Sequence, residues 1–389
     1  YKQGLLQVDN TADEPDLTDS ECENHIQGTQ GPDFNEFPAW RSNDWVKKFS
    51  FFRIEVENLH VFGSALFSDC NFYLGPHHFQ AKLTKPPLSA HEHSAVPETE
   101  LVFDCPVALV LEERASNYYH FTAELLSRAM LTAAVLVPQL QAELQGLDGC
   151  QGLTVLLPKP VKSFMTEAYE LLGWHQGMAN GVTTRFYSQQ QHLLLRKAVV
   201  LDYRPAEHQA DDLWVPLFPP KEGLRMVRMA FQQAMQRSAS ATVAVTQHHY
   251  DVVYVSRNED SRKRKVLNEK DVVAALLGRY GRRKFKVFGS KGVSLLQQMR
   301  VFQHAKVVIA GHGAGLTNML FSNPSVTWIE FHIFPECGIY THMANSLGQD
   351  HLVLSNISTA YLWHYNLTDS NIELLFEVID KKLNWSAKS

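Results

Sequence analysis

The clearest structural signal in the chain is the segment Lys306-Val-Val-Ile-Ala-Gly-His-Gly-Ala-Gly-Leu-Thr-Asn-Met-Leu-Phe321. Residues 307–310 are apolar without alternation, as in a parallel strand that is covered on both faces. Gly311, Gly313 and Gly315 allow a tight turn with exposed N–H groups, and a helix is predicted directly after it. Exposed amides at a helix N-terminus suit an anion, which favours a phosphate-bearing ligand. Such turns also join strand to helix where no ligand binds.

Length and composition describe a globular protein with more than one domain. The chain has 389 residues, more than a single hydrophobic core usually supports. It is 45% hydrophobic and 20% charged, which is ordinary for soluble domains. A net charge of -5 gives no electrostatic reason to expect a nucleic acid as partner.

The chain ends bear on its location. Residues 1–40 are acidic, and we expect a disordered stem there. The longest apolar run, residues 129–138, is too short to cross a bilayer, so we expect any membrane anchor to lie outside this chain. N-glycosylation sequons begin at Asn356, Asn366 and Asn384. They favour the lumen of the endoplasmic reticulum or Golgi, with the chain as the luminal part of a type II membrane protein.

The cysteines show no metal or redox motif. None is spaced as Cys-x-x-Cys, which argues against a zinc ribbon and a thioredoxin-like site. An odd number leaves at least one thiol free or intermolecular, and the sequence does not give the pairing. The five are Cys22, Cys70, Cys105, Cys150 and Cys337.

Strands and helices alternate along both halves of the chain, which predicts parallel α/β sheets. In the first half, strands are expected at 51–67, 107–111, 153–157 and 198–202, with helices at 117–137 and 161–172. In the second half, strands are expected at 250–255, 284–288, 306–310 and 326–331, with helices at 222–236, 268–279, 294–304 and 314–321.

A proline-rich segment, residues 204–221, separates the two halves. We therefore expect one Rossmann-like domain over residues 41–215 and a second over 216–370. The last helix, within 371–389, is expected to pack back on the first domain.

Polar residues gather where the second domain's strands end, which is where open α/β sheets bind ligands. Ser256 and Arg257 follow one strand, and Arg262 and Asn268 come soon after. Arginine binds phosphate oxygens in bidentate fashion, although each arginine could equally be a solvated loop charge. Asn268 could also be an ordinary helix N-cap.

Glu330 lies near the end of the strand that follows the glycine turn. An acidic residue in such a place can accept hydrogen bonds from ribose hydroxyls. The alternative is a surface carboxylate.

In the first domain, His120, Glu124 and Arg128 recur every four residues, after Asn117. Either His120 or Glu124 could act as a general base, with the other orienting it. The alternative is an exposed, salt-bridged helix face.

Several enzyme classes lack their signatures. The chain has no Gly-x-Ser-x-Gly elbow, no P-loop and no His-Glu-x-x-His. Leu316 stands where a dinucleotide fingerprint has its third glycine. No Asp-x-Asp ends a strand to hold a divalent metal on a diphosphate, so no metal and no cofactor are expected.

Taken together, these motifs resemble glycosyltransferase family 61. The resemblance rests on Asn117-Tyr-Tyr-His-Phe121, Tyr254-Val-Ser-Arg257, Arg262 with Asn268-Glu269, Gly311-His-Gly-Ala-Gly-Leu-Thr-Asn318 and Trp328-Ile-Glu330.

The resemblance implies a GT-B fold, in which two Rossmann-like doubly wound α/β domains face a cleft. It implies an inverting, metal-independent transfer from a UDP-sugar to a glycan or glycoprotein, with UDP-xylose slightly favoured over UDP-GlcNAc. His120 or Glu124 would then be catalytic, and Asn117 and Arg128 would serve the acceptor or the fold. Donor contacts would fall on Ser256, Arg257, Arg262, Asn268, His312, Gly313, Ala314, Gly315, Asn318 and Glu330.

Two other functions stay open at this point. One is a nucleotide-sugar-binding module without catalysis, and the other is a Rossmann oxidoreductase. The acceptor, the linkage and the oligomeric state have no signal in the sequence.

Overall fold

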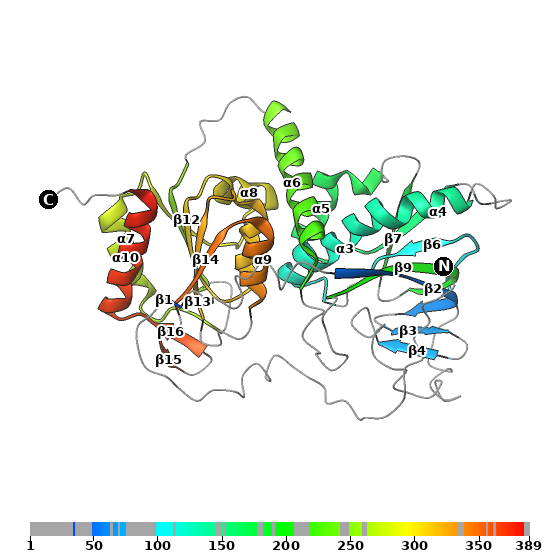
Figure 1. Ribbon diagram of the computed structural model, residues 1–389, viewed down its shortest axis with the longest axis horizontal. Coiled ribbons are helices and arrows are strands. Elements are labelled where there is room, and N and C mark those ends of the chain that lie inside the picture. Colours follow the sequence, from blue (N-terminus) through cyan, green and yellow to red (C-terminus); the bar gives the residue numbers. More distant parts are fainter. Residues whose placement is uncertain are drawn as a thin grey trace. The chain divides into compact units, whose positions relative to one another are not determined.

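The computed structural model describes residues 34–35, 49–62, 65–68, 71–74, 99–111, 114–144, 150, 152–176, 182–188, 191–205, 218–241, 249–258, 263–332, 338–354, 357–360 and 363–384. These residues belong to two compact units that divide between Pro216 and Leu217. The first unit holds residues 1–17 and 49–216, and the second unit holds 18–48 and 217–389. Each unit is an α/β domain (Figure 1).

The first unit is built on a mixed sheet with the strand order β4-β3-β2-β9-β6-β7-β8, in which β5 also pairs with β9. Its strands are β2 (Phe49–Phe62), β3 (Ala65–Ser68), β4 (Asn71–Leu74), β5 (Leu101–Phe103), β6 (Val107–Leu109), β7 (Thr154–Pro158), β8 (Thr183–Tyr187) and β9 (His192–Pro205). Its helices are the continuous run from His120 to Leu144, α5 (Ser163–Leu172) and the short turn η5 (Trp174–Gln176).

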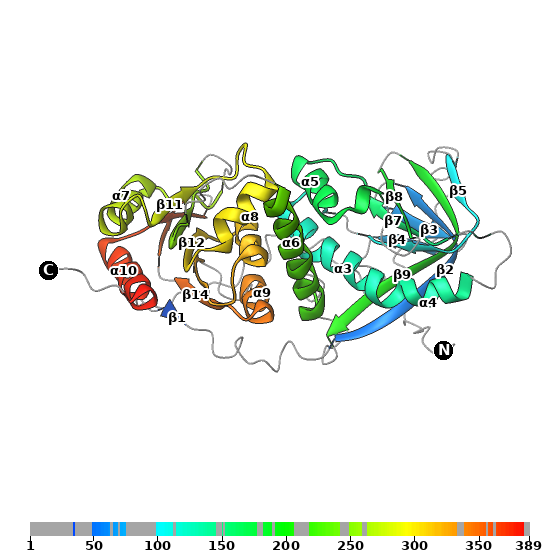
Figure 2. The same ribbon diagram turned by 90° about the horizontal axis from the view of Figure 1, so that it is seen from above.

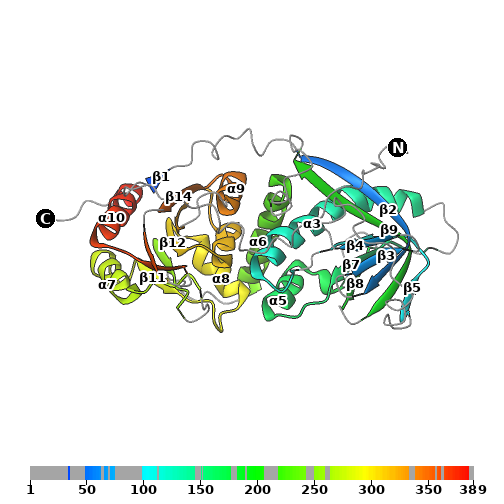
Figure 3. The ribbon, with the colours of Figure 1, turned by 90° about the horizontal axis from the view of Figure 1, so that it is seen from below.

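The long antiparallel pair β2 and β9 departs from the expected parallel sheet. The two strands pair from Phe49 with Pro205 to Phe62 with His192, and they lie side by side in Figure 3. The expected parallel part is formed by β9 with β5 and β6, and by β7 and β8. The expected doubly wound first domain is therefore corrected to a mixed sheet. The physical reason is that β9 is long, with 14 residues. It pairs with β2 in antiparallel fashion and with β5 and β6 in parallel fashion.

The helix from His120 to Leu144 is long and apolar enough to cross a membrane, but 78% of its most apolar window is buried. The apolar run 129–138, on which the sequence expectation rested, lies within this helix of 25 residues. It contains two π-helical stretches, η3 (His120–Leu125) and η4 (Thr132–Leu136), followed by α3 (Leu126–Leu131) and α4 (Val137–Leu144) respectively. Its burial identifies it as a core helix of the first unit.

The second unit contains a largely parallel sheet in the order β1-β14-β13-β12-β10-β11. Its parallel strands are β10 (Val252–Val255), β11 (Phe285–Phe288), β12 (Val307–Gly311), β13 (Thr327–Phe331) and β14 (Asp350–Leu354). Its helices are α6 (Lys221–Ala241), α7 (Glu269–Tyr280), α8 (Leu295–Gln303), η7 (Ala314–Phe321), α9 (Ile339–Leu347) and α10 (Asp369–Leu383), and a hairpin joins β15 (Ser358–Ala360) to β16 (His364–Asn366). The alternation predicted for this half is confirmed, while α9 and β14 were not predicted.

Helices cover both faces of this sheet, as a doubly wound fold requires. In Figure 2, α7 and α10 lie on one side of the strands, and α8 and α9 lie on the other. Adjacent residues of the same strand therefore serve different faces: Ile329 of β13 joins the α7 and α10 core, whereas Trp328 stacks on Phe302 of α8.

Helix α10 packs within the second unit, and the expected packing on the first domain stays a prediction. Leu375 and Ile379 are buried in the core that α10 shares with α7 and the sheet. Arg279 of α7 hydrogen-bonds Asp380 and lies 4.6 Å from the ring centroid of Phe376. The sequence of α10 shows an apolar face, but it does not show which element that face packs against.

Buried polar contacts tie α6 to the rest of the second unit. Arg228 donates hydrogen bonds from Nη1 to Leu347 O (2.9 Å) and from Nη2 to Ser322 O. Both oxygens lie at or just past the C-terminal ends of helices, where carbonyl groups need donors. His342 Nε2 donates to Pro219 O, 2.8 Å away.

Two features involve segments about which the sequence was less informative. Residues Phe34–Asn35 form β1 antiparallel to β14, so the expected disordered stem contains a paired segment, and the rest of residues 1–40 lies outside the described residues. Cys105 and Cys150 form a disulfide in the first unit. The other three cysteines lie outside the described residues.

Candidate functional site

The glycine turn, which we define as Gly311–Gly315, lies where β12 ends and η7 begins. His312 N donates to Phe331 O of the neighbouring strand (2.9 Å), and Leu316 N donates to Gly313 O (2.9 Å). The predicted helix is present, but it is a 3-10 helix. The buried Asn318 donates from Nδ2 to Gly315 O (2.8 Å), so its side chain fixes the turn.

The guanidinium group of Arg257 lies directly against the glycine turn. A Cβ atom at position 313 would be 1.8 Å from Nη1 of Arg257, and one at position 311 would be 3.5 Å from its Cδ. Gly313 also has a φ of +146°, which L side chains rarely adopt. Position 313 must therefore be glycine for the turn and Arg257 to occupy these places, and the result is a cation beside the backbone of the turn.

A second arginine, Arg264, reaches the same region from a strained loop. Its φ is +59°, and its carbonyl oxygen lies 3.4 Å from where a Cβ of Gly311 would be. The loop is held by β16, because Tyr365 N donates to Lys265 O (2.7 Å) and the ring of Tyr365 lies 3.1 Å from the same Cβ position. Strained backbone of this kind gathers at functional sites. Neither Arg264 nor Tyr365 was singled out from the sequence.

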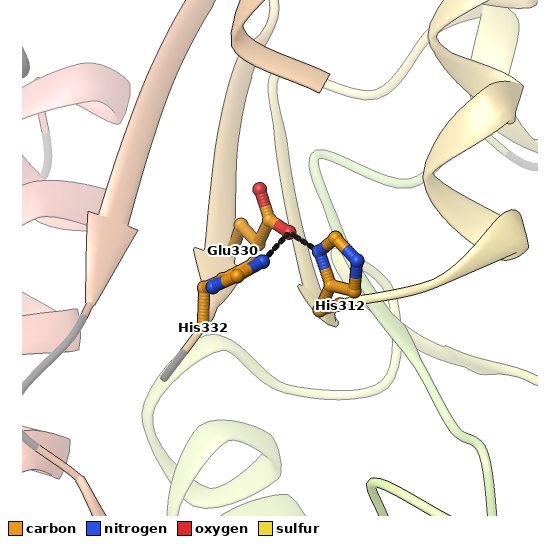
Figure 4. A group of neighbouring side chains, drawn as sticks. All are labelled: His312, Glu330 and His332. Carbon is orange, nitrogen blue, oxygen red and sulfur yellow. Dashed lines mark hydrogen bonds and ion pairs between the residues drawn. The ribbon is translucent and has the colours of Figure 1, made fainter. Parts of the chain in front are cut away.

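Glu330 is the centre of a buried histidine cluster at the end of β13 (Figure 4). Its Oε1 lies 2.5 Å from His312 Nδ1 and 4.0 Å from His332 Nε2, and its Oε2 lies 2.9 Å from His351 Nε2. Thr341 Oγ1 lies 2.9 Å from His351 Nδ1. His332 could have been found from its i+2 spacing to Glu330, whereas His351 stands on β14, which the sequence did not predict.

The surroundings of the cluster lower the pKa of the Glu330 carboxyl and of the His312 and His332 imidazoles. Burial favours the protonated carboxyl, but His312 and His332 and the hydrogen bonds from His312 and His351 outweigh it, so the pKa of Glu330 lies well below its ordinary value. Burial lowers the pKa of His332 well below its ordinary value, and the nearby His312 lowers it further.

His312, Glu330 and His332 also offer the side-chain types of a small metal site. Two observations argue against that use. Ligand atoms that share an ion at about 2.0–2.2 Å each stand farther apart than 2.5 Å in tetrahedral geometry, the distance between His312 Nδ1 and Glu330 Oε1. Arg257 and Arg264 also act on His312 electrostatically and would repel a cation. The distance instead fits a hydrogen bond.

The structure places the remaining expected donor residues in different settings. Ser256 Oγ accepts from Asn258 N (3.3 Å). Asn268 uses both ends of its amide on Leu367, donating to its O (2.7 Å) and accepting from its N (3.1 Å), so it joins two backbone segments and makes no N-cap bond. Arg262 lies outside the described residues. Glu330, expected to bind ribose, has each oxygen near a histidine, and a ribose contact stays a prediction.

The first unit holds a second histidine–carboxylate pair in its π-helical stretch. His120 Nδ1 lies 2.8 Å from Glu124 Oε2, and the side chains are 13% and 1% exposed. Asn117 Oδ1 accepts from Tyr119 N (2.9 Å) where the helix begins, and the buried Arg128 donates to Leu201 O (3.2 Å). This helix face is buried, unlike the solvated salt-bridged face that was the alternative. π-helical turns are frequent at functional sites.

Comparison with known proteins assigns the chain to a family. The family model described as Glycosyltransferase 61 matches residues 118–329, which is more than half of the chain. The match includes the His120 pair and the glycine turn and ends just before Glu330. No curated protein matches the chain significantly. Because the family model matches more than half of the chain, the chain belongs to glycosyltransferase family 61.

Proposed function

We propose that the protein is an inverting glycosyltransferase that moves a sugar from a UDP-sugar to a hydroxyl group of a glycan or glycoprotein. Family membership supports glycosyl transfer. The observation that carries the donor side is the guanidinium group of Arg257, which lies on the glycine turn. A fixed cation beside backbone N–H groups stabilises the negative charge that develops on a departing diphosphate.

The proposal extends to the donor and to the metal requirement. UDP-xylose is the first donor to test and UDP-GlcNAc the second. Arg257 and Arg264 supply positive charge next to the glycine turn, which supports a transfer without a divalent metal. We take the two units as the two domains of a GT-B enzyme, with the donor bound by the second unit.

We propose His120 as the general base. Glu124 is buried and accepts the Nδ1 proton of His120, which leaves the lone pair of Nε2 to take a proton. The acceptor hydroxyl gives its proton to Nε2, and its oxygen forms the bond to the anomeric carbon. The bond from that carbon to the diphosphate breaks at the same time, and the diphosphate leaves with the electron pair.

We further propose that the protein works in the secretory pathway lumen. The disulfide between Cys105 and Cys150 supports an oxidising compartment. Asn366 and Asn384, two of the sequon residues, are exposed to solvent. The third, Asn356, lies outside the described residues.

A binding experiment tests the donor side. We expect UDP-xylose or UDP-GlcNAc to stabilise the protein against heat with and without EDTA, by about 2.7 kcal/mol at a hundred times the dissociation constant. Stabilisation by NAD(P) but not by any uridine nucleotide would favour an oxidoreductase instead. A requirement for a divalent ion would refute the metal-independent scheme.

Substitution of the first-unit pair tests catalysis. His120→Ala should lower kcat about 100- to 10,000-fold while UDP-sugar affinity stays unchanged, because general base catalysis is lost. His175→Ala is a matched control, since His175 is an exposed histidine in the same unit. Full activity in His120→Ala would refute the assignment. A UDP-sugar that binds but is neither transferred nor hydrolysed would favour a binding module.

A further inference from the structure

A buried chain of close polar contacts reaches His312 from one side. Thr341 lies 2.9 Å from His351 Nδ1, and His351 Nε2 lies 2.9 Å from Glu330 Oε2. Thr341 can donate its hydroxyl hydrogen to Nδ1, so the proton of His351 sits on Nε2 and faces Glu330. The other carboxylate oxygen, Oε1, lies 2.5 Å from His312 Nδ1. An ionised carboxylate only accepts hydrogen bonds, so Nδ1 of His312 must carry a proton.

This arrangement fixes the tautomer of His312. A neutral imidazole has one N–H, and Glu330 fixes it at Nδ1. Nε2 then carries a lone pair, and Figure 4 shows that this second ring nitrogen points away from Glu330. The side chain of His312 is 17% exposed, whereas that of Glu330 is 4% exposed. The lone pair of His312 Nε2 is therefore carried by the residue of the cluster that is more exposed than Glu330.

The charges around His312 come from several elements. Burial has the largest influence and lowers its pKa, Glu330 raises the pKa, and Arg264 and Arg257 lower it again, with a net lowering. The rings of His332 and Tyr340 have their centroids 4.0 and 5.3 Å from that of His312. The titratable and charged groups that face it are Glu330, His332, Arg257, Arg264, Tyr340 and Tyr365.

The formal charges of these groups explain what a ligand would change. Without a ligand, the two arginines and one carboxylate leave an excess of positive charge, which opposes a further proton on His312. The diphosphate of a nucleotide-sugar carries two negative charges. Bound at Arg257 and the glycine turn, it reverses the sign of the local charge and favours the imidazolium form.

We propose that His312 takes up a proton on Nε2 when the diphosphate of a nucleotide-sugar binds, and that this imidazolium then hydrogen-bonds the departing diphosphate. The inference rests on the proposed function, since it assumes that the glycine turn binds the donor. The proton comes from solvent on binding. When the bond to the sugar breaks, the electron pair stays on the diphosphate oxygen, and the Nε2–H donates to that oxygen. The proton returns to solvent once the diphosphate leaves and the arginines again oppose it.

Calorimetry of UDP-sugar binding tests this proposal directly. Binding heats measured at neutral pH in two buffers of different ionisation enthalpy give the number of protons exchanged. A UDP-sugar has no phosphate that titrates near neutral pH, so any proton taken up belongs to the protein. We expect an uptake approaching about one proton per bound UDP-sugar, and an affinity that falls up to about tenfold per unit rise in pH. Binding without proton uptake would overturn this inference alone, whereas failure of every UDP-sugar to bind would overturn the proposed function as well.

Matched variants identify the group that takes the proton. His312→Gln should still bind UDP-sugar through Arg257, but without proton uptake and with a pH-independent affinity. His332→Gln is the control, because His332 is a buried histidine beside the same carboxylate and should not be needed for the uptake. Circular dichroism checks that both variants are folded. Uptake that persists in His312→Gln, or disappears in His332→Gln, would show that another group is responsible.

Discussion

Replacing Gly313 with alanine tests the contact between the glycine turn and Arg257. A Cβ atom there would lie 1.8 Å from Nη1 and 2.7 Å from Cζ of Arg257, well inside van der Waals contact. The φ of +146° adds backbone strain for any residue with a side chain. We therefore expect Gly313→Ala to move the guanidinium group away from the turn.

The size of the effect has two parts. Forcing alanine into this backbone conformation costs about 1–3 kcal/mol of folding free energy. Loss of a hydrogen bond from a charged group costs about 1.5–3 kcal/mol of binding free energy. The second part corresponds to a UDP affinity that is about 10- to 150-fold weaker.

A double-mutant cycle measures both parts. Calorimetry with UDP on wild type, Gly313→Ala, Arg257→Ala and the double variant should show strongly non-additive losses, because both changes remove the same guanidinium group. Gly278→Ala is the control, since a Cβ at this position in α7 meets nothing within 4 Å. It should leave UDP affinity unchanged and stabilise the fold by up to about 1 kcal/mol.

Two results would refute the reasoning. One is a folded Gly313→Ala variant whose UDP affinity stays within about threefold of the wild type, a difference worth only about 0.7 kcal/mol. The other is a loss that adds to that of Arg257→Ala, which would mean that the glycine acts independently of the arginine.

Three further variants test the folded structure by urea unfolding. Burial lowers the pKa of His342 to about 4, so the free energy of unfolding should fall as the pH drops from about 6.5 to 4. In His342→Gln this pH-dependent loss, up to about 3 kcal/mol, should disappear. An unchanged pH profile of stability would contradict this. Arg228→Met should cost about 3 kcal/mol, because two helix-end carbonyls lose a charged donor, and a loss below about 1 kcal/mol would contradict the contact. Cys105→Ser with Cys150→Ser should cost about 4 kcal/mol for a separation of 45 residues, and a reductant should destabilise only the wild type.

The second unit could be read from its sequence because its signals are local. Apolar runs such as Val307 to Ala310 need only their own composition to specify a strand buried on both faces, and the glycine turn follows directly. The first unit was read less well, because β9 pairs with β2 over a separation of more than a hundred residues. A single sequence does not show which strand will pair with such an edge.

The site divides in the same way. Arg257, His312 and Glu330 were found from strand ends and glycine spacing, and they lie together in the structure. Asn268 was read as a ligand contact or a cap, yet it binds Leu367, 99 residues away. His351 was missed because only the register of β14 against β13 brings it to Glu330.

The sequence by itself determined the α/β class, the glycine turn and the chemical types available for binding a diphosphate, because periodicity and turn geometry are encoded within short segments. Only the tertiary structure decided how those groups are used. The fold places Arg257 against Gly313 and Arg264 close enough to His312 to affect its charge. It also places Glu330 beside His312 Nδ1, which fixes the tautomer of His312. These relations arise from contacts between strands and loops far apart in the chain, where burial and neighbouring charges set each protonation state.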